Sequence, residues 1–227
     1  MELIQVANFL NGRFLLSNIK NDKNQILNGK MLSSYSVGSL GSVFNEKVYF
    51  DTDDFFFAEK GINIYTVNIN SDNKELVIRY DSEQVTRIEF LKNIPNFFKM
   101  KIGKKEGIEN YYDNISEAVY KVYPTGLNVD IEEYLRKCKP QIRILKKRDS
   151  YRVVNNKGLK MTISFDIAEY SKATSHRKVS QPTLDVVCES YKDRDDFKIF
   201  LHDLVLENPK LIKIESNELT VARKNLD

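Results

Sequence analysis

The sequence of 227 residues contains no tryptophan, two cysteines and two histidines. Cys138 and Cys188 are far apart, so they have neither the paired spacing of a zinc site nor the density of a secreted disulfide scaffold. We therefore expect both thiols to be structural. His176 and His202 have no nucleophile or further ligand at a recognisable spacing, which argues against a histidine-based active site.

Long apolar runs are also missing. The segment Met1–Leu10 has neither the basic region nor the apolar core of a secretory leader, and no stretch is long enough to span a bilayer. The sequence therefore predicts a cytoplasmic protein without a membrane span.

Neither sign of charge is in large excess. The 35 Lys and Arg residues and 32 Asp and Glu residues give a formal net charge of +3. A nucleic-acid interface requires clustered basic residues, and this small excess gives no specific signal for one. Any basic binding site must therefore be local.

Aromatic residues of two kinds are abundant, with 13 Phe and 12 Tyr that recur in short β-rich runs. This pattern favours a sheet over a helical bundle. Hydrophobic residues make up 41% of the chain and charged residues 30%, which is typical of a globular protein. The length and the absence of a Pro/Gly-rich linker predict a single domain over residues 1–227.

The order of expected elements is strands, helices, strands and a final helix. The helices are expected between Asn110 and Lys139, with Asp130 as a cap, and from Asp193 or Asp195 onward, with Phe197, Phe200 and Leu204 on the apolar face. Gly38 and Gly41 are expected in a loop. The expected strands are Val48–Asp51, Ile62–Asn70, Glu75–Tyr80, Val85–Leu91, Gln141–Leu145, Tyr151–Val154, Lys160–Asp166 and Thr183–Glu189.

This order lacks regular βαβ alternation and so predicts an α+β fold. An antiparallel sheet of about eight strands protects its edges most simply by curling into a barrel or tunnel, with the helices flanking it.

Two passages resemble a known family. Val48-Tyr49-Phe50-Asp51-Thr52 followed by Gly61-Ile62-Asn63-Ile64 is similar to the "YFDT … GISLRIR" passage of CYTH and VTC-like domains. The second half, with Pro140–Arg143, Arg148–Tyr151 and Met161–Asp166, resembles the later VTC strands in the same order. The resemblance implies an antiparallel triphosphate tunnel that binds triphosphate or polyphosphate through Lys and Arg, while glutamates hold one or two divalent metals.

The sequence departs from that family where the chemistry is concentrated. The two glutamates that the family carries on its first strand fall on Phe9 and Asn11, and only the basic position remains, as Arg13. Tyr65 and Val67 replace two further arginines. A hard divalent cation needs oxygen ligands, so these changes predict a degenerate member, or pseudoenzyme.

The resemblance and the strand alternation supply the candidate site residues. Asp185 and Glu189 lie about 13 Å apart along a strand, too far to chelate one ion unaided, so a metal would require convergence from neighbouring strands. Lys146-Lys147-Arg148 is equally typical of a solvated turn, and Arg79 and Arg87 of exposed pairs with nearby glutamates. The candidate phosphate ligands are Arg13, Arg79, Arg87, Arg143, Lys147 and Lys160, and the candidate metal ligands are Glu89, Asp166 and Glu189.

Three functions stay open. The first is a degenerate tunnel domain that binds a phosphate-rich small molecule, polyphosphate or a protein partner with little catalysis. The second is an active triphosphatase or polyphosphate polymerase that depends on Mg²⁺ or Mn²⁺. The third is a structural protein-interaction subunit of a larger assembly, which a tunnel plugged by Phe9, Tyr65 and Phe90 would favour.

Overall fold

The structure is a computed structural model, and it describes residues 2–3, 11–69, 73–80, 97–123, 128–189, 193–214 and 218–226. In this part of the chain, ten strands form one sheet in the order β1-β6-β5-β4-β3-β7-β8-β9-β2-β10, and every pairing is antiparallel. The strands are β1 (Glu2–Leu3), β2 (Asn11–Leu15), β3 (Tyr35–Asp51), β4 (Ile62–Ile69), β5 (Asn73–Tyr80), β6 (Phe97–Ile102), β7 (Lys139–Asn155), β8 (Lys160–Lys172), β9 (Lys178–Cys188) and β10 (Ile212–Lys213).

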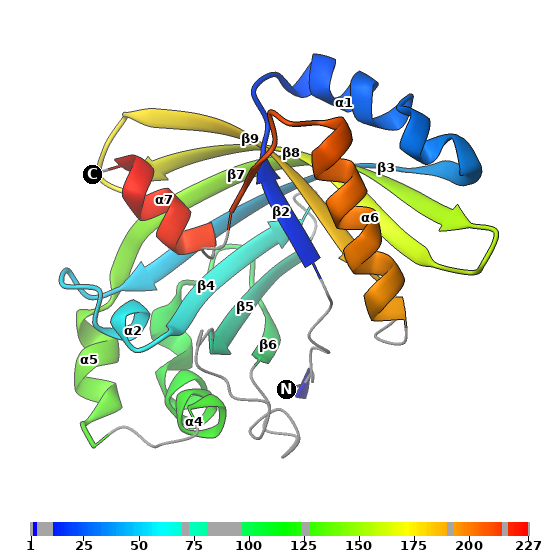
Figure 1. The fold of residues 1–227 in the computed structure, drawn as a ribbon. Coiled ribbons are helices and arrows are strands. Elements are labelled where there is room, and N and C mark those ends of the chain that lie inside the picture. The colour runs from blue at the N-terminus through cyan, green and yellow to red at the C-terminus, as the bar shows by residue number, and fades with distance from the viewer. Residues whose placement is uncertain are drawn as a thin grey trace.

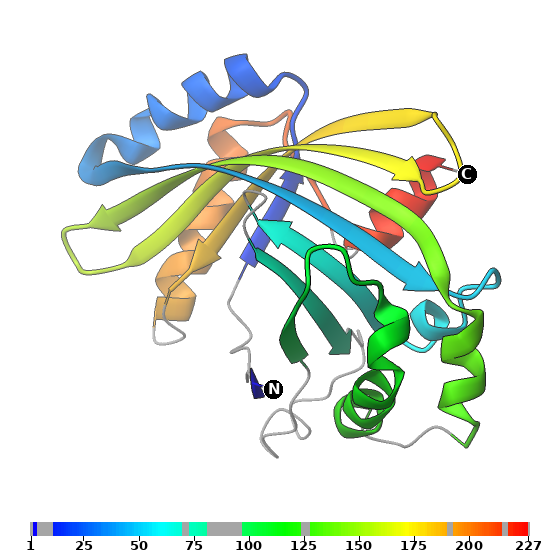
Figure 2. The same ribbon diagram turned by 180° about the vertical axis from the view of Figure 1, so that it is seen from behind.

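The sheet is strongly curved. Strand β2 passes in front of β7 and β3 in Figure 1 and behind them in the reverse view of Figure 2. The predicted α+β class and antiparallel sheet are confirmed. The predicted barrel is not closed in the described residues, where β1 and β10 form the two edges of the sheet.

The helices lie on both faces of this sheet. They are α1 (Ile19–Leu27), α2 (Phe56–Glu59), α4 (Tyr112–Val122), α5 (Ile131–Lys137), α6 (Arg194–Glu207) and α7 (Glu218–Leu226), with short 3₁₀ segments η1 (Lys30–Ser34) and η2 (Ile108–Tyr111). The predicted cap is confirmed, because the Asp130 side chain accepts hydrogen bonds from the backbone N–H groups of Glu132 and Glu133 at the start of α5. The predicted start of α6 after Asp193 is also confirmed.

Two expectations about loops are wrong. Gly38 and Gly41 lie within β3, which runs for 17 residues and has a bulge between Ser39 and Gly41. Gly41 adopts φ +91° there, a conformation that glycine accepts without strain. Residues 146–148 are likewise part of the 17-residue strand β7 and form no turn.

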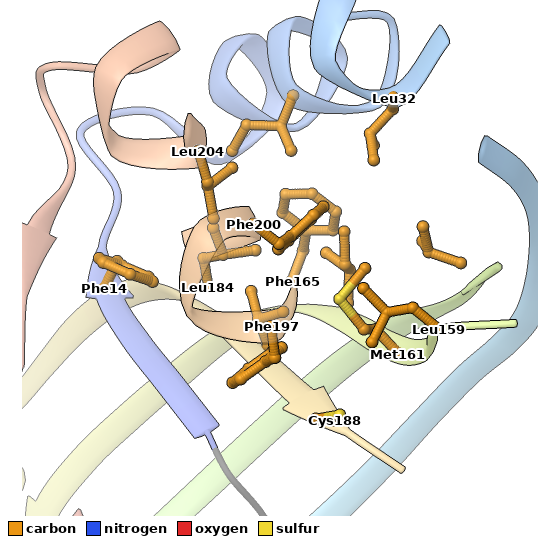
Figure 3. Packing of buried hydrophobic residues seen from close by; sticks show 14 of the residues in the cluster. Phe14, Leu32, Leu159, Met161, Phe165, Leu184, Cys188, Phe197, Phe200 and Leu204 are labelled. Carbon is orange, nitrogen blue, oxygen red and sulfur yellow. The ribbon is translucent and has the colours of Figure 1, made fainter. Parts of the chain in front are cut away.

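The outer face of the sheet is covered by α1 and α6 over strands β2, β8 and β9. Phe197, Phe200 and Leu204 of α6 are buried against Phe165 and Leu184 of the sheet, which confirms the predicted packing of this helix (Figure 3). Cys188 is buried in the same cluster. A second cluster joins α2, α4 and α5 to strands β4, β5 and β6.

The inner face of the sheet is covered in part by α7. Leu219, Val221, Ala222 and Leu226 of this helix form a third cluster with the inner side chains of β3, β4, β7 and β8. Among the described residues, no helix has both the length and the apolar character required to cross a membrane.

Candidate functional site

Strand β7 places its charged residues on two faces. Side chains alternate along a strand, so Lys146 and Arg148 share the inner face with Ile142 and Ile144, which pack with α7. Arg143, at an odd position, lies on the outer face opposite Val48 of β3. A basic residue of this part of β7 therefore lies on the inner face when its number is even and on the outer face when its number is odd.

The inner charges begin with two arginines that share an aspartate. Arg13 of β2 donates to Asp185 of β9 from Nε at 2.7 Å and from Nη2 at 3.2 Å. Arg148 Nη2 donates to Asp185 Oδ2 at 2.5 Å and to Asp166 Oδ2 at 2.6 Å. Arg148 Nε donates to Asp166 Oδ1 at 2.7 Å. Asp166 is fully buried. The two arginines thus link four neighbouring strands of the sheet, β7, β8, β9 and β2.

The network continues toward α7. Lys146 lies 3.5 Å from Asp166 and also contacts Glu218, the first residue of α7. Lys47 of β3 donates to Glu218 Oε2 at 2.6 Å. We call this series the inner charge chain; its members, in order, are Arg13, Asp185, Arg148, Asp166, Lys146, Glu218 and Lys47.

The inner charge chain alternates in sign, and each of its carboxylates touches two cations. Burial alone would raise the pKa of Glu218, but Lys47 and Lys146 hold that pKa well below its usual value. Burial opposes ionisation of Asp185 as well, and the charge and hydrogen bonds of Arg13, with the charge of Arg148, keep its pKa lowered. Glu218 and Asp185 are therefore held as anions by lysine and arginine. Asp166 contacts Arg148 and Lys146.

At the Arg13 end of the inner charge chain, two arginines have N–H donors that make no hydrogen bond to the described residues. The bonds of Arg13 and Arg148 use Nε and Nη2, and Nη1 of each guanidinium makes no hydrogen bond to the described residues. Their side chains are 28% and 31% exposed, whereas that of Lys146 is 7% exposed. Next to them on the inner face, Ser150 and Ser164 share a hydrogen bond with 3.0 Å between the two Oγ atoms. Arg13, Arg148 and Ser150 are partly exposed and can receive an anion from solvent, whereas Ser164 is buried.

Further along the inner face of β7 lies Arg152, which pairs with Glu189 at 2.9 Å and is 50% exposed. By the usual rise, Arg152 is about 13 Å from Arg148 along the strand. The inner face therefore extends its basic character from the inner charge chain toward the far end of β7.

The described residues do not fit a resident divalent metal. They contain no group of three or more His, Cys, Asp or Glu side chains close enough to hold an ion. Asp166 and Asp185, which approach each other at Arg148, are each held by two cations instead. A hard cation needs carboxylates that face one another without such partners.

The candidate phosphate ligands from the sequence fall into three groups. Arg13 belongs to the inner charge chain. Arg79 and Lys160 lie at exposed inner-face positions, where Arg79 is opposite Asn63 in the register of β4 and β5. Arg143 and Lys147 lie on the outer face and are exposed, and Arg143 pairs with Glu46 at 2.6 Å. The remaining candidate, Arg87, lies outside the described residues.

The candidate metal ligands are similarly divided. Asp166 lies in the inner charge chain, and Glu189 pairs with Arg152. Glu89 lies outside the described residues. Asp166, Glu189 and Arg79 thus share the inner face as expected, whereas Arg143, expected there too, is on the opposite face.

Sequence reasoning missed four members of the inner charge chain: Lys47, Lys146, Arg148 and Glu218. The signal for Lys146 and Arg148 was available, because they continue the alternation of Ile142 and Ile144. Glu218 had no such signal, since it stands in a short polar segment whose position depends on its packing partners.

Two positions where the family resemblance implies arginines have a different role here. Tyr65 and Val67 are buried on the inner face in the cluster that includes α7, and the Tyr65 ring lies 5.0 Å from that of Tyr49. Burial raises the pKa of nearby Tyr170 above its usual range, with Glu218 adding to the effect. This part of the inner face is apolar and covered. Of the aromatics considered as a plug, Phe9 and Phe90 lie outside the described residues.

Comparison with known protein families finds no matching family model, and comparison with curated protein sequences finds no match either. Solved structures do match. One is a candidate adenylate cyclase from Bacillus halodurans, with a TM-score of 0.53 at 10% identity over 94% of this chain and 96% of that chain. Another is a candidate adenylyl cyclase from Hippeastrum, described as having a dominant triphosphatase activity, with a TM-score of 0.55 at 12% identity over 96% of this chain and 97% of that chain. The chain therefore has the CYTH-like fold that its two sequence passages predicted, and it shares that fold with these two proteins.

Proposed function

We propose that this chain binds a phosphate-rich anion such as triphosphate on the inner face of its sheet, without metal-dependent hydrolysis. The observation that carries this proposal is the pair of partly exposed side chains of Arg13 and Arg148, whose Nη1 donors make no hydrogen bond to the described residues. Arginine presents several N–H donors in a planar fork, and its charge-assisted bonds to phosphate oxygens are among the strongest hydrogen bonds in proteins.

The anion would meet three kinds of group. Arg13 and Arg148 supply charge and N–H donors, and Arg152 receives the far end of an extended ligand. Ser150 supplies one neutral O–H donor beside them when the buried Ser164 donates its own proton to Ser150. The inner charge chain contains four cations and three carboxylates, so its charge is +1 before the ligand binds. Asp166 and Asp185 hold the two guanidinium groups in place.

The same arrangement argues against hydrolysis. A divalent ion in a triphosphatase neutralises the substrate and activates the attacking water. Here the inner carboxylates are paired with lysine and arginine, and the first-strand position Asn11 provides an amide where the family resemblance implies a glutamate. The geometry therefore supports binding more strongly than turnover.

Arg152 and Arg143 provide a matched test of the proposal. Both belong to β7, both have one ion pair and their side chains are 50% and 48% exposed, but they lie on opposite faces. We expect Arg152→Ala to weaken tripolyphosphate binding about tenfold, which corresponds to about 1.4 kcal/mol, and Arg143→Ala to leave it unchanged. Isothermal titration calorimetry in EDTA measures both constants. Equal effects of the two substitutions, or no binding by the wild-type chain, would refute the proposal.

A second candidate function is triphosphatase activity, which is favoured by the activity described for the Hippeastrum protein of the same fold. Phosphate release from tripolyphosphate, with Mg²⁺ or Mn²⁺ added in parallel to EDTA, separates the two functions. We expect release at the background rate in every condition. Metal-dependent turnover that Asp166→Asn removes would establish the enzyme instead.

A further inference from the structure

A groove of about 650 Å³ lies on the outer side of the molecule, between α6, η1 and the turn that joins β7 to β8. Tyr35 and Phe200 line it with their rings in edge contact, 5.7 Å between centroids. The α6 wall carries Ile199 and Leu206, whose exposed fractions are 61% and 65%. Two large apolar side chains that remain this exposed beside a hollow are typical of a binding surface.

The exposed residues of the α6 wall are arranged as one stripe. Asp196, Ile199, Asp203 and Leu206 are separated by three, four and three residues, which places them on the same side of the helix. Ile199 and Leu206 are two turns apart, about 10 Å along the axis. This is the spacing with which a second helix presents its own apolar residues in side-by-side packing.

Charge on the groove is predominantly negative. Asp196, Asp203 and Glu207 line it, against a single cation, Lys157, on the facing turn. Glu207 is used within the fold, where it accepts the backbone N–H of Met31 at 3.1 Å, and Asp203 lies 3.4 Å from a ring nitrogen of His202. Asp196 makes no ion pair or hydrogen bond with the described residues. Its carboxylate is therefore available to a ligand.

Two of the groove carboxylates change the pKa of Tyr35, an aromatic residue that lines the groove. The pKa of Tyr35 is raised, first by burial and then by the negative charges of Asp203 and Asp196, although a hydrogen bond from Asn155 opposes the shift. The two aspartates thus impose a negative potential inside the groove as well as at its rim. A cationic occupant would be attracted by this potential.

We propose that this groove binds an amphipathic helix of a partner protein, with its apolar stripe on Ile199 and Leu206 and its lysines or arginines beside Asp196 and Asp203. Helix-in-groove recognition uses anchors at i, i+3 or i+4 and i+7, and Ile199 and Leu206 supply two apolar contacts with the i and i+7 spacing. The acidic rim selects a basic segment over an acidic one. The surface lies on the opposite side of the sheet from the inner charge chain, so it requires no anion there.

The test uses two fluorescein-labelled peptides of 16 residues with the same leucine stripe, one with lysine and one with glutamate on the polar face. We expect fluorescence anisotropy to show saturable binding of the lysine peptide and at least tenfold weaker binding of the glutamate peptide. The double variant Ile199→Gln/Leu206→Gln should weaken binding of the lysine peptide at least tenfold. Asp196→Asn/Asp203→Asn should weaken it and reduce its dependence on salt.

Leu40→Gln is the matched control, because Leu40 is 57% exposed but lies in β3 and does not line the groove. All substituted residues are exposed or lie at the rim, so circular dichroism should show the same fold in every variant. Binding that Leu40→Gln reduces as much as the groove variants do would overturn the proposal. So would a wild-type dimer in light scattering that Ile199→Gln/Leu206→Gln converts to a monomer, because the occupant would then be a second copy of this chain.

Discussion

Strand β7 carries a buried, ion-paired lysine on its inner face and an exposed lysine on its outer face. Lys146, on the inner face, is 7% exposed and touches Asp166 and Glu218. Lys147, the next residue, is exposed on the outer face. A basic residue on a strand therefore acquires its role from the parity of its position and from what covers that face.

The difference has an energetic origin. Moving a charge from water into the protein interior costs several kcal/mol, so a buried cation is tolerated only where anions and hydrogen bonds compensate. The inner charge chain meets this condition by alternation, since Asp166, Asp185 and Glu218 each touch two cations. On the outer face, water solvates the charges, and pairs such as Arg143 with Glu46 contribute little.

The largest expected effect follows from removing one lysine of this adjacent pair. Lys146→Ala leaves Asp166 and Glu218 buried with one cation fewer, and we expect a loss of about 3 kcal/mol in the free energy of unfolding. Lys147→Ala should change it by less than about 0.5 kcal/mol. Urea denaturation followed by circular dichroism measures both. Similar losses for the two variants would mean that burial does not distinguish the faces.

The next prediction concerns the dependence of stability on pH, which the buried carboxylates of the inner face should dominate. The pKa values of Glu218 and Asp185 are lower in the folded protein than the ordinary values of 4.5 and 3.8, so the folded state binds fewer protons than the unfolded chain. The stabilisation is therefore complete above about pH 4.5 and is lost as the pH falls below the ordinary values toward the lower folded ones. We expect the melting temperature to be nearly constant from pH 7 to pH 5 and to fall below that range.

The outer face offers a control for this acid dependence. The pKa of Asp149 is also lowered, by its hydrogen bonds from Lys23 and Ser42, but its side chain is 29% exposed, whereas that of Glu218 is 9% exposed. Glu218→Gln should flatten the acid limb of the melting curve more than Asp149→Asn does. A larger change in the Asp149 variant would contradict the interpretation that the buried network determines the acid response.

Much of the fold could be predicted from the sequence because it depends on local patterns. Period-two runs located β4, β5, β8, β9 and two parts of β7, and Asp130 and Asp193 located two helix starts. The expected strand Val85–Leu91 lies outside the described residues, and β6 was not predicted. These signals need only neighbours in sequence.

The candidate site was harder to predict because it depends on register and on tertiary cover. Basic residues occur at both odd and even positions of β7, and a shift of one residue exchanges the faces. The run Lys146-Lys147-Arg148 is also typical of an exposed turn. Glu218 could not be found at all, since its burial results from α7 packing on Tyr65 and Val67, which are distant in sequence.

Two strand glycines distinguish a covered surface from an open one through small changes in stability. Gly12 of β2 faces α6, and a Cβ added there would lie 2.8 Å from Leu201 Cδ2, so Gly12→Ala requires Leu201 to shift and should cost about 1 kcal/mol. Gly38 of β3 pairs with Arg152 on the inner face, and an added Cβ meets nothing within 4 Å. Gly38→Ala should therefore stabilise the protein by about 0.5 kcal/mol, because alanine restricts the unfolded chain more than glycine does. Urea denaturation of both variants decides the matter: destabilisation by Gly38→Ala would show that the surface beside Arg152 is covered, and the proposed access of an anion to that arginine would then fail.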